Sequence, residues 1–204
     1  MFTLLSKNEN AVIVLHEIYG LNNHIKQVCK ELHNSGLDVY CPNFLNREEP
    51  FSYDQHSQAY DYFMKFCGFD TSMIFDLLTR IRDRYKKIII VGFSVGGTLA
   101  WLCSESAQCD GIVSFYGSRI RDYTDIMPNS PTLVIQAKYE ESYDPYFLQH
   151  KLSKYSLVSF HIFNSRHGFC DPFNKAYNPS ESAKALTLSH DFITKIINYF
   201  NVTG

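Results

Sequence analysis

A single serine separates a stiff apolar run from a glycine pair in the stretch IIIVGFSVGG at 88–97. Gly92, Ser94 and Gly96 fit the pattern G-x-S-x-G, in which a sharp strand-to-helix turn lifts a serine hydroxyl clear of a sheet. The pattern alone is weak, because roughly 5–10% of chains this long contain it by chance at average composition. Its context is stronger, because the strand-like run KIIIV precedes it and the helical run GGTLAWLCSESA follows it. We therefore predict a nucleophilic serine; the alternative is a capping serine in a plain glycine-rich turn.

A serine hydroxyl needs a base, and His167 is the best placed of the eight histidines. It lies in a loop just after the apolar run at 157–163, and open α/β sheets carry their sites at such strand ends. His161 lies inside that run and is expected in the core, whereas His56 lies in an irregular segment and stays open as an alternative. Four histidines fall on helical patterns and are expected at the surface: His24, His33, His150 and His190.

The base in turn needs an acid that orients it, and this acid is expected after the apolar run at 132–137. Glu140, Glu141 and Asp144 follow that run. We favour Glu140, because Asp144 precedes a proline and has the position of a helix cap. Glu141 and Asp144 remain alternative acids. The chain order of serine, acid and histidine is that of the α/β-hydrolases.

The elements that would hold these residues are short apolar runs alternating with longer amphipathic runs. Several of the apolar runs are continuous, as expected for strands buried on both faces of a parallel sheet. Alternating strands and helices predict a three-layer α/β fold whose mostly parallel central sheet has about seven strands. Together with the order of serine, acid and histidine, this indicates an α/β-hydrolase fold. The expected strands are an edge strand FTLL at the start, 11–15, 37–41, 87–91, 111–117, 132–137 and 157–163. The clearest helical stripes cover 25–32, 74–81 and about 180–200.

The chain shows no internal repeat or Pro/Gly-rich linker, so we expect a single domain over 1–204. The irregular segment 46–67 is rich in aromatic and polar residues and longer than an ordinary strand-to-helix loop. We expect it to contain a helix of its own. Segments of this kind often cover a ligand cleft, and a helix packed on the surface is the alternative.

Composition excludes several classes of function. A net charge of −2 gives no electrostatic footprint for nucleic acid or an anionic membrane. No signal-like start and no membrane-length apolar run occur, so we expect a cytoplasmic protein, either a monomer or a homodimer. The six scattered cysteines predict buried thiols rather than disulfides. We expect no cofactor and no metal, because no G-x-G-x-x-G, Walker A or zinc-protease spacing is present.

Four stretches of the chain resemble the dienelactone hydrolase family of α/β-hydrolases. They are HEIYGLNNHIKQVCKEL at 16–32, GFSVGG at 92–97, FYG at 115–117 and RHGF at 166–169. They span nearly the whole chain in the family's order. Typical members hydrolyse small cyclic enol-lactones or related esters with a cysteine, aspartate and histidine triad, assisted by a glutamate in a His-Glu-Ile/Val motif.

The resemblance implies roles for residues at matching positions. Ser94 stands at the position of the family nucleophile, and His167 at that of the family histidine. Glu17 matches the assisting glutamate. Ile18 and Val95 match the residues whose backbone N–H groups form the oxyanion hole. Without the resemblance, Glu17 and the histidine before it are equally well interpreted as two polar residues in water at the edge of the sheet.

Three departures from the family pattern change the expectations. The nucleophile is a serine, whose hydroxyl is less acidic than a thiol, so proton transfer to the histidine should accompany attack. Glu17 would then position Ser94 or shape the pocket. The acid is a glutamate, best matched by Glu140. Asp171 lies where the family has a carboxylate-binding arginine, which argues against an anionic dienelactone.

The residues and the resemblance together predict a cofactor-free serine hydrolase that cleaves a small ester or lactone through an acyl-serine intermediate. Two alternatives stay open: a catalytically weak relative that acts as a binding module, and a thioesterase or peptidase on the same scaffold. Phe93, Tyr116, Phe169 and the aromatic residues of 51–66 are expected to line the substrate pocket and to favour an apolar or aromatic acyl group.

Overall fold

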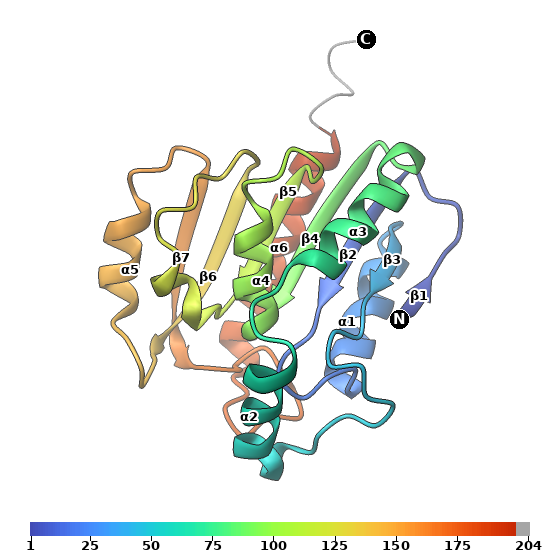
Figure 1. Cartoon of the computed structure of the whole chain (residues 1–204). Coiled ribbons are helices and arrows are strands. Elements are labelled where there is room, and N and C mark those ends of the chain that lie inside the picture. The colour runs from blue at the N-terminus through green and yellow to red at the C-terminus, as the bar shows by residue number, and fades with distance from the viewer. Residues whose placement is uncertain (199–204) are drawn as a thin grey trace.

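A computed structural model describes residues 1–198 as a seven-stranded sheet with helices on both faces (Figure 1). The strand order is β1-β3-β2-β4-β5-β6-β7; β1 is antiparallel to β3, and all other neighbours are parallel. The strands are Phe2–Leu4 (β1), Asn10–Leu15 (β2), Asp38–Cys41 (β3), Lys87–Phe93 (β4), Gly111–Phe115 (β5), Thr132–Tyr139 (β6) and Val158–Arg166 (β7). The α-helices of this part of the chain are Asn23–Asn34 (α1), His56–Phe66 (α2), Ser72–Ile81 (α3), Val95–Cys103 (α4), Pro145–Leu152 (α5) and Pro179–Asn198 (α6).

This arrangement confirms the predicted fold class. The central strands β2, β4 and β5 are almost entirely buried, which explains why their sequences are continuously apolar rather than alternating. All predicted strands are present, including the edge strand β1. The end of the last helix was expected near Phe200, which lies outside the described residues.

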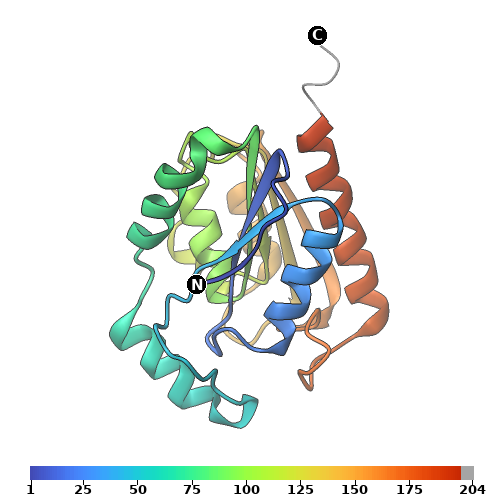
Figure 2. The same cartoon turned by 90° about the vertical axis from the view of Figure 1, so that its right-hand side faces the viewer.

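The helices divide between the two faces of the sheet (Figure 2). Helices α1 and α6 cover one face and enclose a core with the strand side chains that point toward them, such as Val14 and Ile135. Helices α3 and α4 cover the other face, where alternate strand residues such as Ile13 and Ile90 are buried. Helix α5 packs on that second face through Leu148 and Leu152. Successive strand side chains therefore serve two separate cores, as the pleat of a strand requires.

The segment 46–67 contains a helix, as predicted, and lies beyond the carboxyl ends of the strands (Figure 1). Its core residue is Phe63 of α2, which is fully buried. Phe63 belongs to a hydrophobic cluster that also contains Ile18 and Val95, the residues that follow β2 and begin α4. The segment is thereby fixed directly above the ends of β2 and β4.

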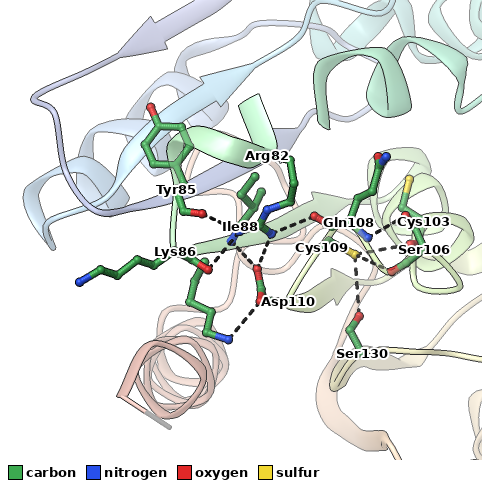
Figure 3. Close-up of polar contacts among 11 residues, drawn as sticks. Arg82, Tyr85, Lys86, Ile88, Cys103, Ser106, Gln108, Cys109, Asp110 and Ser130 are labelled. Carbon is green, nitrogen blue, oxygen red and sulfur yellow. Dashed lines mark hydrogen bonds and ion pairs between the residues drawn. The ribbon is translucent and has the colours of Figure 1, made fainter. Parts of the chain in front are cut away.

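A polar cluster ties the opposite edge of the sheet together, where β4 and β5 begin (Figure 3). The guanidinium of Arg82 donates hydrogen bonds to the Asp110 carboxylate at 2.6 Å and to the backbone carbonyl oxygens of Tyr85 and Gln108. The same carboxylate accepts a hydrogen bond from the backbone N–H of Ile88. The cluster fixes the entry points of two central strands, far from the edge that carries Ser94.

The cysteines and the apolarity of the helices can be compared with the expectations from composition. All six cysteines are free and five of them are buried, with Cys67 partly exposed, as the composition predicts. No helix among residues 1–198 is long and apolar enough to cross a membrane.

Candidate active site

Ser94 is the single residue between the end of β4 and the start of α4, and its backbone adopts φ +55° and ψ −116°. A positive φ is uncommon for a residue with a side chain and marks strain at a tight turn. The turn brings the serine to the wall of a cavity at the carboxyl edge of the sheet. Helix α4 begins directly behind it, so the unpaired N–H groups and the positive end of the helix dipole face the same cavity.

Glycines on both sides of Ser94 permit this turn. A Cβ on Gly92 would lie 2.8 Å from the backbone nitrogen of Gly97, and one on Gly96 would lie 2.5 Å from the carbonyl oxygen of His16 and closer still to that of Leu15. Real Cβ atoms essentially never approach such atoms within 3.0 Å. Glycine is therefore required for α4 to begin against the carboxyl end of β2.

The structure brings the predicted serine, histidine and acid into one hydrogen-bonded line. The Ser94 Oγ lies 2.9 Å from the His167 Nε2. The His167 Nδ1 lies 2.9 Å from one carboxylate oxygen of Glu140 and 3.2 Å from the other. The carboxylate only accepts, so Nδ1 carries the proton and Nε2 is free to accept the serine proton. This is the tautomer that a general base beside a serine requires.

The charge of Glu140 tunes the base. Burial by itself lowers the pKa of His167, but the hydrogen bond and the negative charge of Glu140 outweigh this effect, with a further contribution from the charge of Glu17. The net result is a pKa of His167 above its ordinary value of 6.5. The Glu140 side chain is only 4% exposed, whereas that of His167 is 38% exposed. The pair thus holds a basic imidazole at an accessible position.

Glu140 and His167 reach one another because their strands are longer than the apolar runs predict. β6 continues to Tyr139 and β7 to Arg166, and these two residues pair across the strands. The other two acids are placed differently. Glu141 is exposed on the cavity wall, and Asp144 caps α5 by accepting a hydrogen bond from the backbone N–H of Tyr146, as its sequence position predicts.

Ile18 and Val95 lie on the cavity wall beside Ser94. Val95 is the first residue of α4, so its N–H has no partner within the helix. Ile18 follows β2, the strand next to β4 in the sheet. The close approach of α4 to the end of β2 therefore brings the two backbone segments near one another; that their N–H groups form an oxyanion hole stays a prediction.

The cavity has a volume of about 580 Å³, and its wall is more polar than predicted. Three arginines line it: Arg119 and Arg121 from the short 3-10 helix after β5, and Arg166 at the end of β7. Arg119 also donates to the hydroxyl of Tyr60 on α2, which links the segment 46–67 to the opposite wall. These cationic residues come from segments with no marked sequence pattern, and they weigh against the expectation that anionic substrates are disfavoured, which stays a prediction.

The expectation that Phe93, Tyr116 and Phe169 line the pocket is wrong. All three are at most 1% exposed and belong to the core under α1 and α6. Successive residues of a strand point to opposite faces of a sheet. Phe93, next to Ser94, points to the face covered by α1 and α6, where it stacks on Phe115. The Tyr116 ring instead supports the imidazole of His167 from within, with ring centres 5.0 Å apart.

Glu17 and His16 are buried, which rules out the alternative that they lie in water at the edge of the sheet. The His16 Nδ1 donates to the carbonyl oxygen of Glu17 at 2.7 Å, and its ring stacks on Phe44. Burial and the nearby charge of Asp171 raise the pKa of Glu17, against the opposing influences of His167 and Tyr116, and the net result is a pKa of about 7. Glu17 also lines the cavity, so its side chain lies between the cavity and the buried side chain of His24.

Two residues behind Glu17 were not singled out as functional by sequence reasoning. His24 was expected at the surface but is 2% exposed, and Asp171 is fully buried. His24 lies four residues before Val28, on the buried stripe of α1, so the helical period contained this signal. His161, expected in the core, is half-buried because β7 is an edge strand.

Comparison with known proteins identifies the family. The model of the dienelactone hydrolase family matches residues 2–197. The chain belongs to the dienelactone hydrolase family. It has the α/β-hydrolase fold of that family, with Ser94 at its strand-to-helix turn.

Two relatives and one solved structure show what this chain is similar to. The uncharacterized protein YczH of Bacillus subtilis (strain 168) is 35% identical over 181 residues, which cover 87% of this chain and 89% of the relative. A carboxymethylenebutenolidase of Pseudomonas putida is 28% identical over 119 residues, which cover 52% of this chain and 49% of the relative. A solved structure, a dienelactone hydrolase-like promiscuous phosphotriesterase from metagenomic libraries, aligns with a TM-score of 0.71 at 18% identity and covers 94% of this chain and 88% of its own. The last likeness concerns the fold alone.

Proposed function

We propose that this family member is a cofactor-free serine hydrolase that cleaves a small ester or lactone through an acyl-serine intermediate. The observation that carries the proposal is the line of hydrogen bonds from the Ser94 hydroxyl through the His167 imidazole to the Glu140 carboxylate. The distances between the three side chains support the proton transfers that acyl transfer demands. Membership of a hydrolase family supports the same reaction class.

In this mechanism the Ser94 Oγ attacks the substrate carbonyl carbon while its proton moves to the Nε2 of His167. The carbonyl oxygen becomes an oxyanion, which accepts hydrogen bonds from the backbone N–H groups of Ile18 and Val95. His167 then donates the proton to the departing alkoxide, and the acyl group remains on Ser94. A water molecule repeats the sequence, with His167 as its base, and releases the acid. Glu140 holds the imidazole in the required tautomer and stabilises its cationic form throughout.

The cavity favours a substrate that carries negative charge. Three arginines lie on its wall, together with the carboxyl groups of Glu17, Glu140 and Glu141. Glu140 is engaged by His167, and Arg119 and Arg121 are paired with Asp122, whereas Arg166 forms no ion pair among the described residues. A guanidinium binds a carboxylate or phosphate group with directed hydrogen bonds. We therefore propose that the acyl or alcohol part of the ester bears an anionic group.

A fluorophosphonate probe tests the nucleophile. The wild-type protein should be labelled once per chain, and Ser94→Ala should lose the label. Ser118→Ala is the matched control, because Ser118 lines the same cavity without contacting the histidine in the described hydrogen bonds. A folded wild-type protein that takes up no label, or a Ser94→Ala variant labelled as fully as wild type, would refute the proposed function and favour a binding module.

Substrate panels separate the remaining alternatives. The initial rates on p-nitrophenyl acetate, a γ-lactone and a short acyl-thioester, each measured for wild type and Ser94→Ala, compare an esterase, a lactonase and a thioesterase. We expect the ester and the lactone to be preferred over the thioester. A dominant thioesterase activity that requires Ser94 would leave the nucleophile in place and overturn the proposed substrate class.

A further inference from the structure

Three metal-ligating side chains converge behind the cavity, from three separate parts of the fold. Glu17 follows β2, His24 lies in the first turn of α1, and Asp171 lies in the loop after β7. Their exposed fractions are 3%, 2% and 0%. One ligand atom from each residue lies within 4.8 Å of the other two. The His24 Nδ1 is 3.7 Å from the Asp171 Oδ2 and 3.9 Å from the Glu17 Oε2.

These separations are too long for hydrogen bonds, and two of the atoms have no other partner. The Oε2 of Glu17 and the Nδ1 of His24 are buried without a hydrogen bond among the described residues. Leaving a buried polar atom unpaired is costly, and native proteins seldom do so. The two carboxyl groups also face the same small space, and neither forms an ion pair with a lysine or arginine among the described residues. A cation among the three groups would supply the missing partner to the Glu17 Oε2 and the His24 Nδ1, with the Asp171 carboxylate as a third ligand.

We propose that Glu17, His24 and Asp171 form a binding site for one divalent transition-metal ion of the Zn²⁺ class. Zinc binds histidine nitrogen and carboxylate oxygen at about 2.0–2.2 Å, which holds the ligand atoms of a tetrahedral site roughly 3.3–3.6 Å apart. The two separations from the His24 Nδ1, 3.7 and 3.9 Å, require an adjustment of only a few tenths of an ångström, and the Glu17 and Asp171 oxygens lie within 4.8 Å of one another. The imidazole favours zinc, copper, iron or nickel over magnesium and calcium, which prefer oxygen ligands throughout.

The surroundings hold the three ligands in place. The Asp171 Oδ2 accepts a hydrogen bond from the hydroxyl of Tyr53 at 2.5 Å, and its Oδ1 accepts one from the backbone N–H of Phe173 at 2.8 Å. The Tyr53 hydroxyl is itself held by the Asn22 side chain at 3.1 Å. Such outer partners orient metal-binding carboxylates in proteins. The Asp171 carboxylate is therefore held in a fixed orientation, unlike the mobile carboxylates of a surface acidic cluster.

The ion can reach this position through the cavity, because Glu17 lines the cavity on one side and faces His24 on the other. The buried hydroxyl of Tyr116 lies close to the Glu17 carboxyl group and is a further candidate oxygen. The site shares no residue with the line of Ser94, His167 and Glu140. Binding can therefore be measured whether or not the proposed hydrolase reaction is correct.

Isothermal titration of the chelator-treated protein with ZnCl₂ tests the site. We expect one ion per chain, and at least a tenfold loss of affinity in His24→Gln and in Asp171→Asn. His190→Gln is the matched control, because His190 and Asp191 form an exposed pair with the same separation of 3.9 Å between a ring nitrogen and a carboxylate oxygen. His167→Gln distinguishes the site from the triad and should retain binding.

Two readouts keep the test decisive if a buried substitution disturbs folding. Circular dichroism checks each variant, and His24→Gln carries the test if Asp171→Asn does not fold. Co²⁺ binding adds a visible absorption spectrum that should disappear in His24→Gln and persist in His190→Gln. Wild-type protein that binds no Zn²⁺ at 100 µM, or binding that is lost in His167→Gln but kept in His24→Gln, would overturn the proposal.

Discussion

Substituting Gly96 by alanine tests whether the close contact between α4 and β2 is what aligns the active site. An alanine Cβ at position 96 would meet the backbone carbonyl oxygens of Leu15 and His16, the second at 2.5 Å. Since 3.0 Å is the practical limit for such contacts, helix and strand must separate by at least about 0.5 Å at His16, and by more at Leu15. Both neighbours are backbone atoms, so a change of side-chain rotamer cannot relieve the clash.

The separation acts directly on the proposed oxyanion hole. Val95 moves with α4 and Ile18 moves with the end of β2, so the clash pushes apart the two backbone N–H groups that must bind one oxygen atom. A misplacement of 1 Å can cost on the order of a hundredfold in rate, so we expect kcat/KM to fall about 10- to 100-fold. The overpacking itself should lower the free energy of unfolding by about 1–3 kcal/mol.

The assay compares kcat/KM on p-nitrophenyl acetate with the free energy of unfolding from urea titration. Gly36→Ala is the control, because Gly36 has φ +92° and no atom within 4 Å of a Cβ. It should cost about 1–2 kcal/mol of stability through backbone strain alone and leave the activity within twofold of wild type. A folded Gly96→Ala variant with nearly wild-type kcat/KM would refute the claim that this contact positions the catalytic groups.

Three further predictions follow from the charges of the site and the fold. Since Glu140 raises the pKa of His167 and the neutral imidazole is the active base, the acidic limb of kcat/KM against pH should shift to lower pH in Glu140→Gln, together with a loss of rate; an unchanged limb would exclude this acid. Arg166→Met should lower kcat/KM at least fivefold for an ester with a carboxylate in its acyl group and leave a neutral ester within twofold; equal losses on both would contradict a charge-selective role. Arg82→Met should lower the free energy of unfolding by about 2 kcal/mol, because it removes several partly buried hydrogen bonds. Lys86→Met is the control, because it breaks only an exposed ion pair worth about 0–1 kcal/mol. Equal losses of unfolding free energy in the two variants would show that the Arg82 cluster does not stabilise the fold.

The fold could be predicted because hydrophobic periodicity reports burial. The run at 88–91 is apolar at every position, and all four side chains are at most 2% exposed in the centre of the sheet. The ends of β6 and β7 could not be predicted in the same way. Tyr139 and Arg166 pair through the backbone, and that pairing does not depend on apolar side chains. Periodicity therefore located the strands but underestimated two strand ends, the ones that carry Glu140 and His167.

The residues of the proposed triad could be nominated from sequence because a parallel sheet places the ends of its strands along one edge. Ser94, Glu140 and His167 each follow the carboxyl end of a strand, so strand position and chain order were sufficient to select them. The wall of the cavity followed no such rule. Arg119 and Arg121 come from a short 3-10 helix that has no apolar periodicity in the sequence. The direction of their side chains depends on how that segment packs.

The cluster of Glu17, His24 and Asp171 shows a different limit of strand-end reasoning. Glu17 and Asp171 both lie after strand ends, but His24 reaches them from the buried side of α1. A helix adds a ligand to the edge of a sheet only if its axis and rotation are fixed, and neither can be derived from the helical stripe alone. The stripe does require that any polar residue on the buried face finds a partner. His24 lies on the buried face, and its Nδ1 has no hydrogen-bonding partner among the described residues. The metal titration tests whether a bound ion is the partner of this atom.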